Sequence, residues 1–498
     1  MGNGPGDLEA YWQVMDKYDN FFGGCVWEML DHSVDIGTTG KPAYIYGGDF
    51  GNVPHDSNFC VDGLLYPDRR PHTGMLELKQ VLRPCRVTAF DPVKKTVQLR
   101  NTRYFTDLSD LDLYWTLERN GKVIDSGRLT ALSVAPRHSR TYKLPLPDVD
   151  LLDGFCYLNL SFRSNVTHPW ADVGYEVGFE QFELAAKAIT PVSAPAVHAT
   201  FAAETQGNEI RILDGSAVYT VDRVHGLIVS LTGDGKELLS SPVTPTVWRA
   251  PTDNDRKVKK DWINAGYDRM QVKCYDCQLT EVSENVIRVG AKLSMGAAAK
   301  RPLLQLDAVY EFKRGEGVTL HTDVKKSADT PFLPRFGFVF KMPADCEQLR
   351  YFGRGPVESY LDKRQASRMG LFHTTVTEHF EHYVRPQENT AHADTRWVEI
   401  ANLAGQGLLA TNTEGSSAFS FNCSHFTAEQ LTQTAHDYEL VPLTETVVNL
   451  DCRHSGIGSN SCGPKLDASL QLNESSFSFS VRLLPVLVNN TCPFEKIV

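Results

Sequence analysis

The sequence lacks a long apolar run and an export signal. Across its 498 residues, no stretch reaches the roughly 18 apolar residues that suggest a membrane-spanning helix. The first residues, from Met1 to Asp7, are rich in glycine and lack the basic and apolar regions of a secretory signal. We therefore expect a protein that does not bind membranes and that stays in the cytoplasm.

An excess of positive charge is also absent. Lysine and arginine number 50 against 61 aspartates and glutamates, which gives a formal charge of -11 and a pI near 5.8. Proteins that hold nucleic acid or anionic lipid place clustered basic side chains against phosphate groups. The charge balance therefore argues against both partners, whereas neutral ligands such as sugars are compatible with it.

The cysteines are not spaced in pairs. Their number, 11, is odd and their placement irregular, which is not the pattern of a disulfide framework and agrees with a reducing compartment. Cys274 and Cys277 form one CxxC motif, but no second pair and no nearby histidine pair completes a zinc site. We therefore expect no metal or redox role for these two cysteines.

Residues 1–83 have the pattern of part of a (β/α) barrel, in a chain long enough for about three domains. Asp7 is in position to cap an amphipathic helix that runs to about Tyr18. Cys25 to Trp27 predict a short buried strand, and Gly74 to Val81 predict a second helix. A barrel cannot close its sheet from one or two strands. The segment therefore predicts a partner, either a missing N-terminal part or another chain.

The rest of the chain is patterned as strands. Residues 84–184 hold about seven short segments of period-two alternation, which predict an immunoglobulin-like sandwich. Residues 185–198, rich in Ala, Pro, Ser and Val, predict a linker. Residues 199–498 predict one large sandwich of more than a dozen strands, with its chief helix at Ala428 to Ala435. The expected fold class is mainly β and multidomain: a partial barrel, an immunoglobulin-like sandwich and a large β-supersandwich.

The segment from Phe21 to Arg69 has the composition of a sugar site. Glycine pairs and carboxylates stand there among aromatic rings, which suits a pocket that stacks a sugar ring and binds its hydroxyl groups. The alternative is a tryptophan in the core beside an acidic turn, since buried aromatic rings mostly serve packing. The aromatic residues of the segment include Trp27, Tyr44, Tyr46, Phe50 and Phe59.

Five motifs carry a resemblance to a known family. In chain order they are FFGGCVWEMLDHS from Phe21, VWRAPTDNDR from Val247, YFGRGPVESYLDKR from Tyr351, YVRPQENTAHADTRW from Tyr383 and RHSGIGSNSCGP from Arg453. Together they resemble the C-terminal part of the multidomain β-galactosidases of glycoside hydrolase family 2, and the first resembles the end of the catalytic barrel. The resemblance covers nearly the whole chain. It implies the same three-part architecture that the patterns predict.

The resemblance implies roles for four residues. Trp27 matches the tryptophan on which a galactose ring packs. Phe59 and Asp62 match positions that hold a sodium ion through a main-chain carbonyl and a side-chain oxygen, and the extra charge of Asp62, where the family usually has Asn, should tighten cation binding. Cys462 stands where some members have a Trp at the acceptor subsite. Because a thiol offers less stacking area, acceptor binding there should be weaker or differently specific.

The resemblance also implies what this chain does not carry. A retaining glycosidase uses two carboxyl groups about 5 Å apart, and in the family both catalytic glutamates and the magnesium ligands lie upstream of the matched region. None of the carboxylates from Glu28 to Asp68 matches a catalytic position. We therefore expect no catalytic residue here, no activity of the chain alone, and magnesium only in the complete enzyme.

The resemblance implies a substrate and partners for the complete protein. It would hydrolyse terminal non-reducing β-D-galactosides such as lactose, commonly as a homo-oligomer, with its chemistry supplied by the missing N-terminal portion or a complementary subunit. The chain is then a truncation, an incomplete gene model or the small subunit of a split enzyme. Two alternatives stay open: a non-catalytic sugar-binding or scaffolding protein, and a hydrolase of glucuronides or mannosides.

Three groups of residues centred on arginine remain. We expect buried arginine–carboxylate pairs that lock loops in preference to substrate contacts. His425 and His454 are expected to pack in the interior in preference to facing the cleft. The arginine groups are Arg249 with Asp253, Asn254 and Asp255, Arg354 with Glu358, and Arg385 with Glu388 and Asn389.

Overall fold

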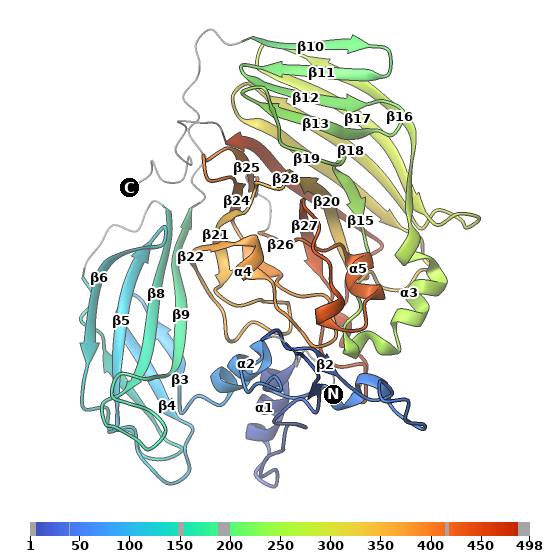
Figure 1. Ribbon diagram of the computed structural model, residues 1–498. Coiled ribbons are helices and arrows are strands. Elements are labelled where there is room, and N and C mark those ends of the chain that lie inside the picture. Colours follow the sequence, from blue (N-terminus) through green and yellow to red (C-terminus); the bar gives the residue numbers. More distant parts are fainter. Residues whose placement is uncertain (1–5, 39, 148–153, 188–199, 414–417, 487–498) are drawn as a thin grey trace.

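Strands dominate the computed structural model, in which two β domains stand above and beside a small N-terminal segment (Figure 1). The structure describes residues 6–38, 40–147, 154–187, 200–413 and 418–486. Within these ranges no helix has both the length and the apolar character needed to cross a membrane. The predicted fold class, mainly β and multidomain, is confirmed.

The N-terminal segment consists of two helices joined by long loops. Both predicted helices are confirmed to within a residue or two. None of the residues of the first helix is fully buried, whereas the second buries both polar and apolar side chains. The elements are α1 (Leu8–Lys17), β1 (Val34–Asp35), β2 (Tyr44–Ile45), the 3-10 turn η1 (Ser57–Cys60) and α2 (Thr73–Val81).

The predicted buried strand at Cys25 to Trp27 is wrong. These residues are exposed and pair with no other strand in the described part of the chain. Parallel pairing near them is limited to one bridge between Leu30 and Leu65. A barrel strand is held by neighbours on both sides, and the described residues supply a neighbour on one side only.

Seven strands form the predicted immunoglobulin-like sandwich, with sheet orders β3-β4-β7 and β6-β5-β8-β9. Their apolar inner faces make a core of their own. Ala185 to Lys187, predicted as the start of the linker, instead pair with Gly154 to Cys156, and the rest of the predicted linker lies outside the described residues. The strands are β3 (Cys85–Asp91), β4 (Thr96–Asn101), β5 (Leu111–Arg119), β6 (Lys122–Leu129), β7 (Ser139–Lys143), β8 (Gly154–Ser164) and β9 (Glu176–Lys187).

The large domain contains three sheets of five, nine and five strands around one continuous core, which confirms the predicted sandwich. The first sheet has β10 (Phe201–Gln206), β11 (Glu209–Asp214), β12 (Ala217–Asp222), β13 (Leu227–Gly233) and β14 (Lys236–Glu237). The second has, in spatial order, β16 (Gln271–Val282), β17 (Val286–Gly296), β18 (Leu304–Lys313), β19 (Gly317–Lys326), β28 (Ser476–Val486), β25 (Gly407–Thr411), β24 (Trp397–Ala401), β21 (Gln348–Gly355) and β22 (Arg368–Thr375). The third has β15 (Thr244–Thr246), β20 (Arg335–Met342), β27 (Thr446–His454), β26 (Phe419–Ser424) and β23 (His392–Thr395).

Helices of the large domain are short. The predicted helix after Thr427 is present as α5 (Ala428–Gln433), two residues shorter than expected. It begins with a capping box, in which Gln430 N donates to Thr427 Oγ1 at 3.2 Å and Thr427 N donates to Gln430 Oε1 at 2.9 Å. The other helical pieces are η2 (Asp253–Arg256), α3 (Lys259–Ala265), η3 (Tyr267–Arg269), α4 (Val376–His379), η4 (Asp437–Glu439) and η5 (Ala468–Leu470).

Helix α2 joins the N-terminal segment to both β domains. Arg83, just after the helix, forms an ion pair with Glu180 of β9 at 2.7 Å. The carboxylate of Glu77 accepts hydrogen bonds from Arg364 N at 3.2 Å and from Ala366 N at 2.8 Å in the large domain. The segment therefore has fixed contacts on two sides.

A buried carboxylate, Glu358, lies at the centre of this joint. It accepts hydrogen bonds from Lys363 Nζ at 2.6 Å, Thr73 Oγ1 at 2.8 Å, Tyr383 Oη at 2.5 Å and Thr390 N at 2.8 Å. Burial by itself would raise the pKa of Glu358, but Lys363 and these donors hold it below the ordinary value. The charged form is therefore the one that the joint stabilises.

The substitution Lys363→Met tests this joint. It leaves the Glu358 carboxylate buried without its cation, so the free energy of unfolding should fall by about 3–5 kcal/mol. Urea unfolding followed by circular dichroism measures the change. The control, Lys325→Met, removes an exposed lysine from β19 and should change the free energy by about 0.5 kcal/mol or less. Equal midpoints for the two variants would contradict a stabilising role for the joint.

Candidate functional site

Two short segments run side by side and form one wall of the candidate site. Glu28 N donates to the Asp62 carbonyl at 3.2 Å, and Leu64 N donates to the Glu28 carbonyl at 2.9 Å. Asp31 N reaches the Leu65 carbonyl at 2.9 Å. These backbone bonds fix where the two segments lie relative to one another.

Asp31 fixes the turn that carries Asp62. Its Oδ1 accepts a hydrogen bond from Gly63 N at 2.8 Å, and its Oδ2 lies 2.9 Å from His72 Nε2. The His72 ring stacks on Tyr66 with 3.6 Å between ring centroids. A Cβ atom at position 63 would lie 2.3 Å from Asp31 N, so this close approach requires glycine.

A cavity of about 350 Å³ opens beside this wall. Three of the four predicted site residues line it: Trp27 and Asp62 from the N-terminal segment, and Cys462 from the large domain. Trp27 is 69% exposed, so it does not belong to the core of this chain. The volume suits a small ligand, and the role of Trp27 as a platform for a sugar ring stays a prediction.

The other aromatic residues of the segment do not converge on this cavity. Phe59 is absent from its lining, and the Arg256 guanidinium lies over the Phe59 ring, 5.1 Å from its centroid. Tyr46 packs in a small core cluster, and Phe50 is 65% exposed. Of the aromatic residues proposed for the pocket, Trp27 alone lines it.

The carboxylate of Asp62 is buried and lacks a partner. The residue is 5% exposed, and neither carboxylate oxygen has a hydrogen-bond partner in the described part of the chain. Burial raises the pKa of Asp62 to about 6, and the nearby carboxylates of Glu28 and Asp31 contribute. Unsatisfied buried oxygens call for a partner, and hard oxygens are what a hard cation binds. Asp62 therefore fits the role of a cation ligand.

Asp62 does not complete a metal site by itself. Among the described residues, no group of three or more His, Cys, Asp and Glu side chains is arranged to hold a metal ion. Any cation at Asp62 would need further oxygen ligands, for which a main-chain carbonyl such as that of Phe59 is suitable. Sodium at Phe59 and Asp62 stays a prediction.

Buried charge holds the loop that carries Cys462. Arg249 is fully buried and donates to both oxygens of Asp255, at 3.2 and 2.9 Å. The same guanidinium donates to the carbonyls of Ser455 and Gly456 at 2.6 and 3.0 Å. The start of the loop is therefore fixed by two hydrogen bonds from one side chain, which Asp255 in turn holds in place.

Two further side chains hold the middle of this loop. Asp362 accepts hydrogen bonds from Ile457 N at 3.0 Å and from Gly458 N at 2.7 Å. Asn254 Nδ2 donates to the Ile457 carbonyl at 3.0 Å. Ser459 then adopts a left-handed conformation with φ of 60°. This turn leads the chain to Cys462 at the cavity.

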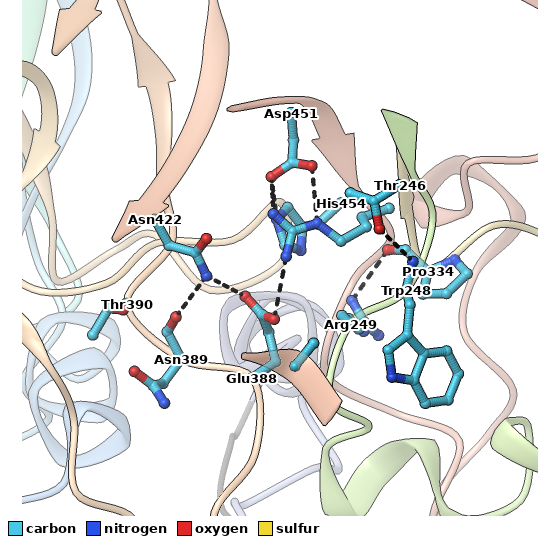
Figure 2. A network of polar contacts seen from close by, with 12 residues as sticks. Thr246, Trp248, Arg249, Pro334, Glu388, Asn389, Thr390, Asn422, Asp451 and His454 are labelled. Carbon is cyan, nitrogen blue, oxygen red and sulfur yellow. Dashed lines mark hydrogen bonds and ion pairs between the residues drawn. The ribbon is translucent and has the colours of Figure 1, made fainter. Parts of the chain in front are cut away.

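A second buried network includes Glu388, Asn422, Asp451 and His454 (Figure 2). Arg335 donates to Asp451 Oδ1 at 2.9 Å and lies 3.5 Å from Glu388. Asn422 Nδ2 donates to Glu388 at 2.9 Å, and His454 Nε2 lies 3.2 Å from Asp451. Arg335, Asp451, Glu388 and His454 are each buried, so this network supports the fold and does not face a ligand.

The predicted arginine pairs are confirmed only in part. Arg249 pairs with Asp255 as expected. Arg354 pairs with Asp394 at 2.5 Å and not with Glu358. Outside a helix, side chains four residues apart need not face one another, and β21 and the turn after it send Arg354 and Glu358 to different neighbours.

Arg385 makes an unexpected contact with the N-terminal segment. Its Nη1 donates to Asn58 Oδ1 at 2.8 Å, and the structure gives it no ion pair with Glu388 among the described residues. Asn58 Nδ2 in turn donates to Asp253 Oδ1 at 2.7 Å. The prediction of an Arg385–Glu388 pair is therefore wrong, because Arg335 from another strand takes that place.

Several residues that sequence analysis did not assign to the sugar site also line the cavity. They include Cys25, Asn254 and Ser461. Asn254 and Ser461 belong to two of the quoted motifs, so the motifs could have indicated that these residues lie at the site. Cys25 was instead predicted to lie in a buried strand. Neither His425 nor His454 lines the cavity, as expected.

Substitution of tryptophans separates an exposed platform from a core residue. Trp27→Ala should change the free energy of unfolding by about 0.5 kcal/mol or less, because most of the ring is already in water. The control Trp262→Ala removes a side chain that is 0% exposed and should cost about 3–5 kcal/mol. Urea unfolding measures both values. A loss at Trp27 as large as that at Trp262 would make Trp27 a core residue.

Comparison with known families assigns the three parts of the chain. The model described as "Beta galactosidase small chain" matches residues 214–483. "Beta-galactosidase, domain 4" matches residues 97–185, and "Glycosyl hydrolases family 2, TIM barrel domain" matches residues 1–87. These matches follow one another along the chain.

Individual relatives agree with these matches. A beta-galactosidase of Actinobacillus pleuropneumoniae is 35% identical over 97% of this chain and 47% of its own length. One of Staphylococcus xylosus is 32% identical over 97% of this chain and 48% of its own length. Among solved structures, a putative aldose 1-epimerase of Escherichia coli K12 is similar over 58% of this chain and 99% of its own length, with a TM-score of 0.31 and 11% sequence identity. A similarity this low carries no argument.

The chain spans about half the length of these relatives. Its small-chain match covers more than half of the 498 residues. The order of the three matched parts is the order in which the structure places a barrel segment, an immunoglobulin-like domain and a large β-sandwich. The chain therefore belongs to the β-galactosidases of glycoside hydrolase family 2 and corresponds to a C-terminal part of such a protein.

Proposed function

We propose that this chain is part of a retaining β-galactosidase that hydrolyses terminal non-reducing β-D-galactosides such as lactose. The observation that carries the proposal is the meeting of Trp27 and Asp62 with Cys462 at one cavity, although more than 400 residues separate Trp27 from Cys462. An exposed indole beside an unsatisfied carboxylate can stack a sugar ring and bind its hydroxyl groups.

In this proposal the residues of the chain bind and orient the sugar but do not cleave it. Trp27 packs against the C–H face of galactose, and the loop with Cys462 shapes the space for the leaving group. The nucleophile and the acid/base, a pair of carboxyl groups about 5 Å apart in retaining enzymes, come from the rest of the barrel. The magnesium ion of the complete enzyme belongs to that part as well.

A sodium ion fits the unsatisfied oxygens of Asp62. The Phe59 carbonyl and the Asp62 carboxylate would hold it, with remaining ligands from outside this chain and from a sugar hydroxyl. When bound, the ion supplies a fixed positive charge that orients that hydroxyl group. The protein's own contribution is the fixed turn, because the carboxylate of Asp31 holds the Gly63 amide next to Asp62.

The proposed partner is the rest of the barrel. Apolar side chains of the N-terminal segment lie open to solvent, among them Tyr11 at 44%, Val14 at 51% and Phe22 at 103% exposure. An exposed apolar surface of this kind marks an interaction site, and an incomplete barrel must cover its open side. A homo-oligomer of the complete enzyme in the cytoplasm is part of the same proposal.

A second candidate is the small subunit of a split galactosidase, or a non-catalytic sugar-binding protein with the same cavity. The observation that favours it is the presence of both cavity walls within this one chain. A split enzyme would need the same catalytic partner, whereas a binding protein would not. Complementation therefore separates a non-catalytic binding protein from a part of a galactosidase.

Complementation tests the proposal directly. The 498-residue chain alone should not hydrolyse a chromogenic galactoside, and addition of an N-terminal galactosidase portion with the remaining barrel should restore turnover. In the restored enzyme Trp27→Ala should lower kcat/KM by about tenfold or more, because the sugar loses its stacking surface. The control Trp170→Ala changes an equally exposed tryptophan of the immunoglobulin-like domain. Turnover by the chain alone, or binding without any restored turnover, would contradict the proposal.

Cys462 offers a test of the acceptor subsite. In the restored enzyme, Cys462→Trp adds an aromatic face where the leaving sugar would lie, so glucose should compete with water as an acceptor at a severalfold lower concentration. The yield of transfer products against free glucose concentration measures this effect. Cys274→Trp, at a partly exposed cysteine that does not line the cavity, is the control. An unchanged glucose dependence in Cys462→Trp would exclude Cys462 from the acceptor subsite.

A further inference from the structure

Five basic residues belong to the stretch from η2 to α3 and to the loop of Arg385, which meet near the N-terminal segment, and three of them, Arg256, Lys259 and Arg385, lie close enough to influence one another electrostatically. None of the five forms an ion pair within 4.0 Å with any described residue. Most arginines elsewhere are paired, as Arg249 is with Asp255 and Arg350 with Glu399. The basic cluster consists of Arg256, Lys257, Lys259, Lys260 and Arg385.

The basic cluster is connected to the cavity wall through η2 and the turn before Asp62, although none of its five residues lines the cavity. Asn254 and Asp62 both line the cavity. Two residues further along η2, the Arg256 guanidinium lies 5.1 Å from the centroid of the Phe59 ring, in the turn just before Asp62. Arg385 reaches the same turn through Asn58 at 2.8 Å. A ligand that extends from the cavity along this turn would meet the basic cluster.

The positive charge of the basic cluster is only partly compensated. The carboxylates nearest in sequence are Asp253, Asp255 and Asp261. Asp255 pairs with Arg249. Burial raises the pKa of Asp253, although Asn58 and the cations of the cluster oppose that rise. Burial lowers the pKa of Lys259, and repulsion by Arg385 and Arg256 adds to this effect, whereas the carboxylates of Asp253 and Asp255 oppose it. A local excess of cations in a chain of net charge -11 is electrostatically costly unless an anion binds there.

We propose that the basic cluster binds an anionic substituent, a sulfate, phosphate or carboxylate group, on a galactoside whose sugar ring lies on Trp27. The inference rests on the proposed function. It adds galactosides that carry an acidic group to the neutral galactosides proposed as substrates. Guanidinium and ammonium groups without carboxylate partners are free to donate to such oxygens. Arg256, Lys257 and Lys260 are exposed, so an anion can reach them from solvent.

The test compares two substrates in the enzyme restored by complementation. The ratio of kcat/KM for the 3-sulfate or 6-sulfate of 4-nitrophenyl β-D-galactoside to kcat/KM for the unsulfated compound is measured. In the variant Lys257→Gln/Lys260→Gln this ratio should fall by about tenfold for at least one sulfate ester, and added sodium chloride should lower it in the unsubstituted enzyme. Sodium sulfate at equal ionic strength shows whether a free anion competes for the same place.

A charge-matched variant controls for net charge. Lys292→Gln/Lys325→Gln removes two exposed lysines from β17 and β19, on the sheet at the far side of the large domain from the N-terminal segment (Figure 1). This variant should keep the ratio within about twofold, because exposed charges beyond a Debye length are screened. A ratio that is the same in both variants, or a loss that is equal for both substrates, would overturn the proposal and indicate a solvated basic surface.

A binding measurement distinguishes failure of this inference from failure of the proposed function. Calorimetric titration of the chain alone with galactose 6-sulfate and galactose 3-sulfate should give tighter binding than galactose by about tenfold, and Lys257→Gln/Lys260→Gln should remove the difference. Restored turnover of neutral galactosides without any preference for the sulfated sugars overturns this inference alone. Absence of restored turnover overturns the proposed function, while the titration still decides whether the basic cluster binds an anion.

Discussion

The burial of the Glu358 carboxylate is the constraint on which the position of the N-terminal segment against the large domain depends. Its donors come from both sides of the joint, since Thr73 belongs to α2 whereas Lys363, Tyr383 and Thr390 belong to the large domain. A buried charge is tolerated only when every donor is in place. The position of the N-terminal segment against the large domain is therefore fixed. The cavity wall that this segment forms is fixed with it.

The same principle fixes the opposite wall of the cavity. Arg249 and Asp255 form a fully buried pair whose remaining donors hold the carbonyls of Ser455 and Gly456. Asp362 then holds the amides that follow. Loops that line binding sites are often mobile, but here buried hydrogen bonds to the backbone fix the path that leads to Cys462. Both walls of the cavity thus depend on buried charges and not on apolar packing alone.

Local signals in the sequence predicted the elements that depend on local interactions. The positions of α1, α2 and α5, the Thr427 cap and the alternation in the strands depend on few long-range partners and were predicted correctly. The predicted Asp7 cap of α1 was wrong, because its side chain makes no capping hydrogen bond. The strand predicted at Cys25 to Trp27 was wrong because an apolar run forms a barrel strand only when neighbours pair with it on both sides. The predicted pairings of Arg354 and Arg385 were wrong because their actual partners, Asp394 and Asn58, are distant in the sequence. That Trp27 and Cys462 would share a cavity was implied by family resemblance alone, since no periodicity relates residues so far apart.

The unpaired state of Cys25 to Trp27 has a thermodynamic consequence for the proposed assembly. The turn with Asp62 and the loop with Cys462 are already held, so their ordering adds little to the cost of binding a sugar. Trp27 differs, because the residues before Glu28 lack strand neighbours among the described residues. A barrel portion that pairs with this stretch would order Trp27 and so strengthen sugar binding. By linkage, a sugar bound on Trp27 must strengthen the association of the two portions by the same factor.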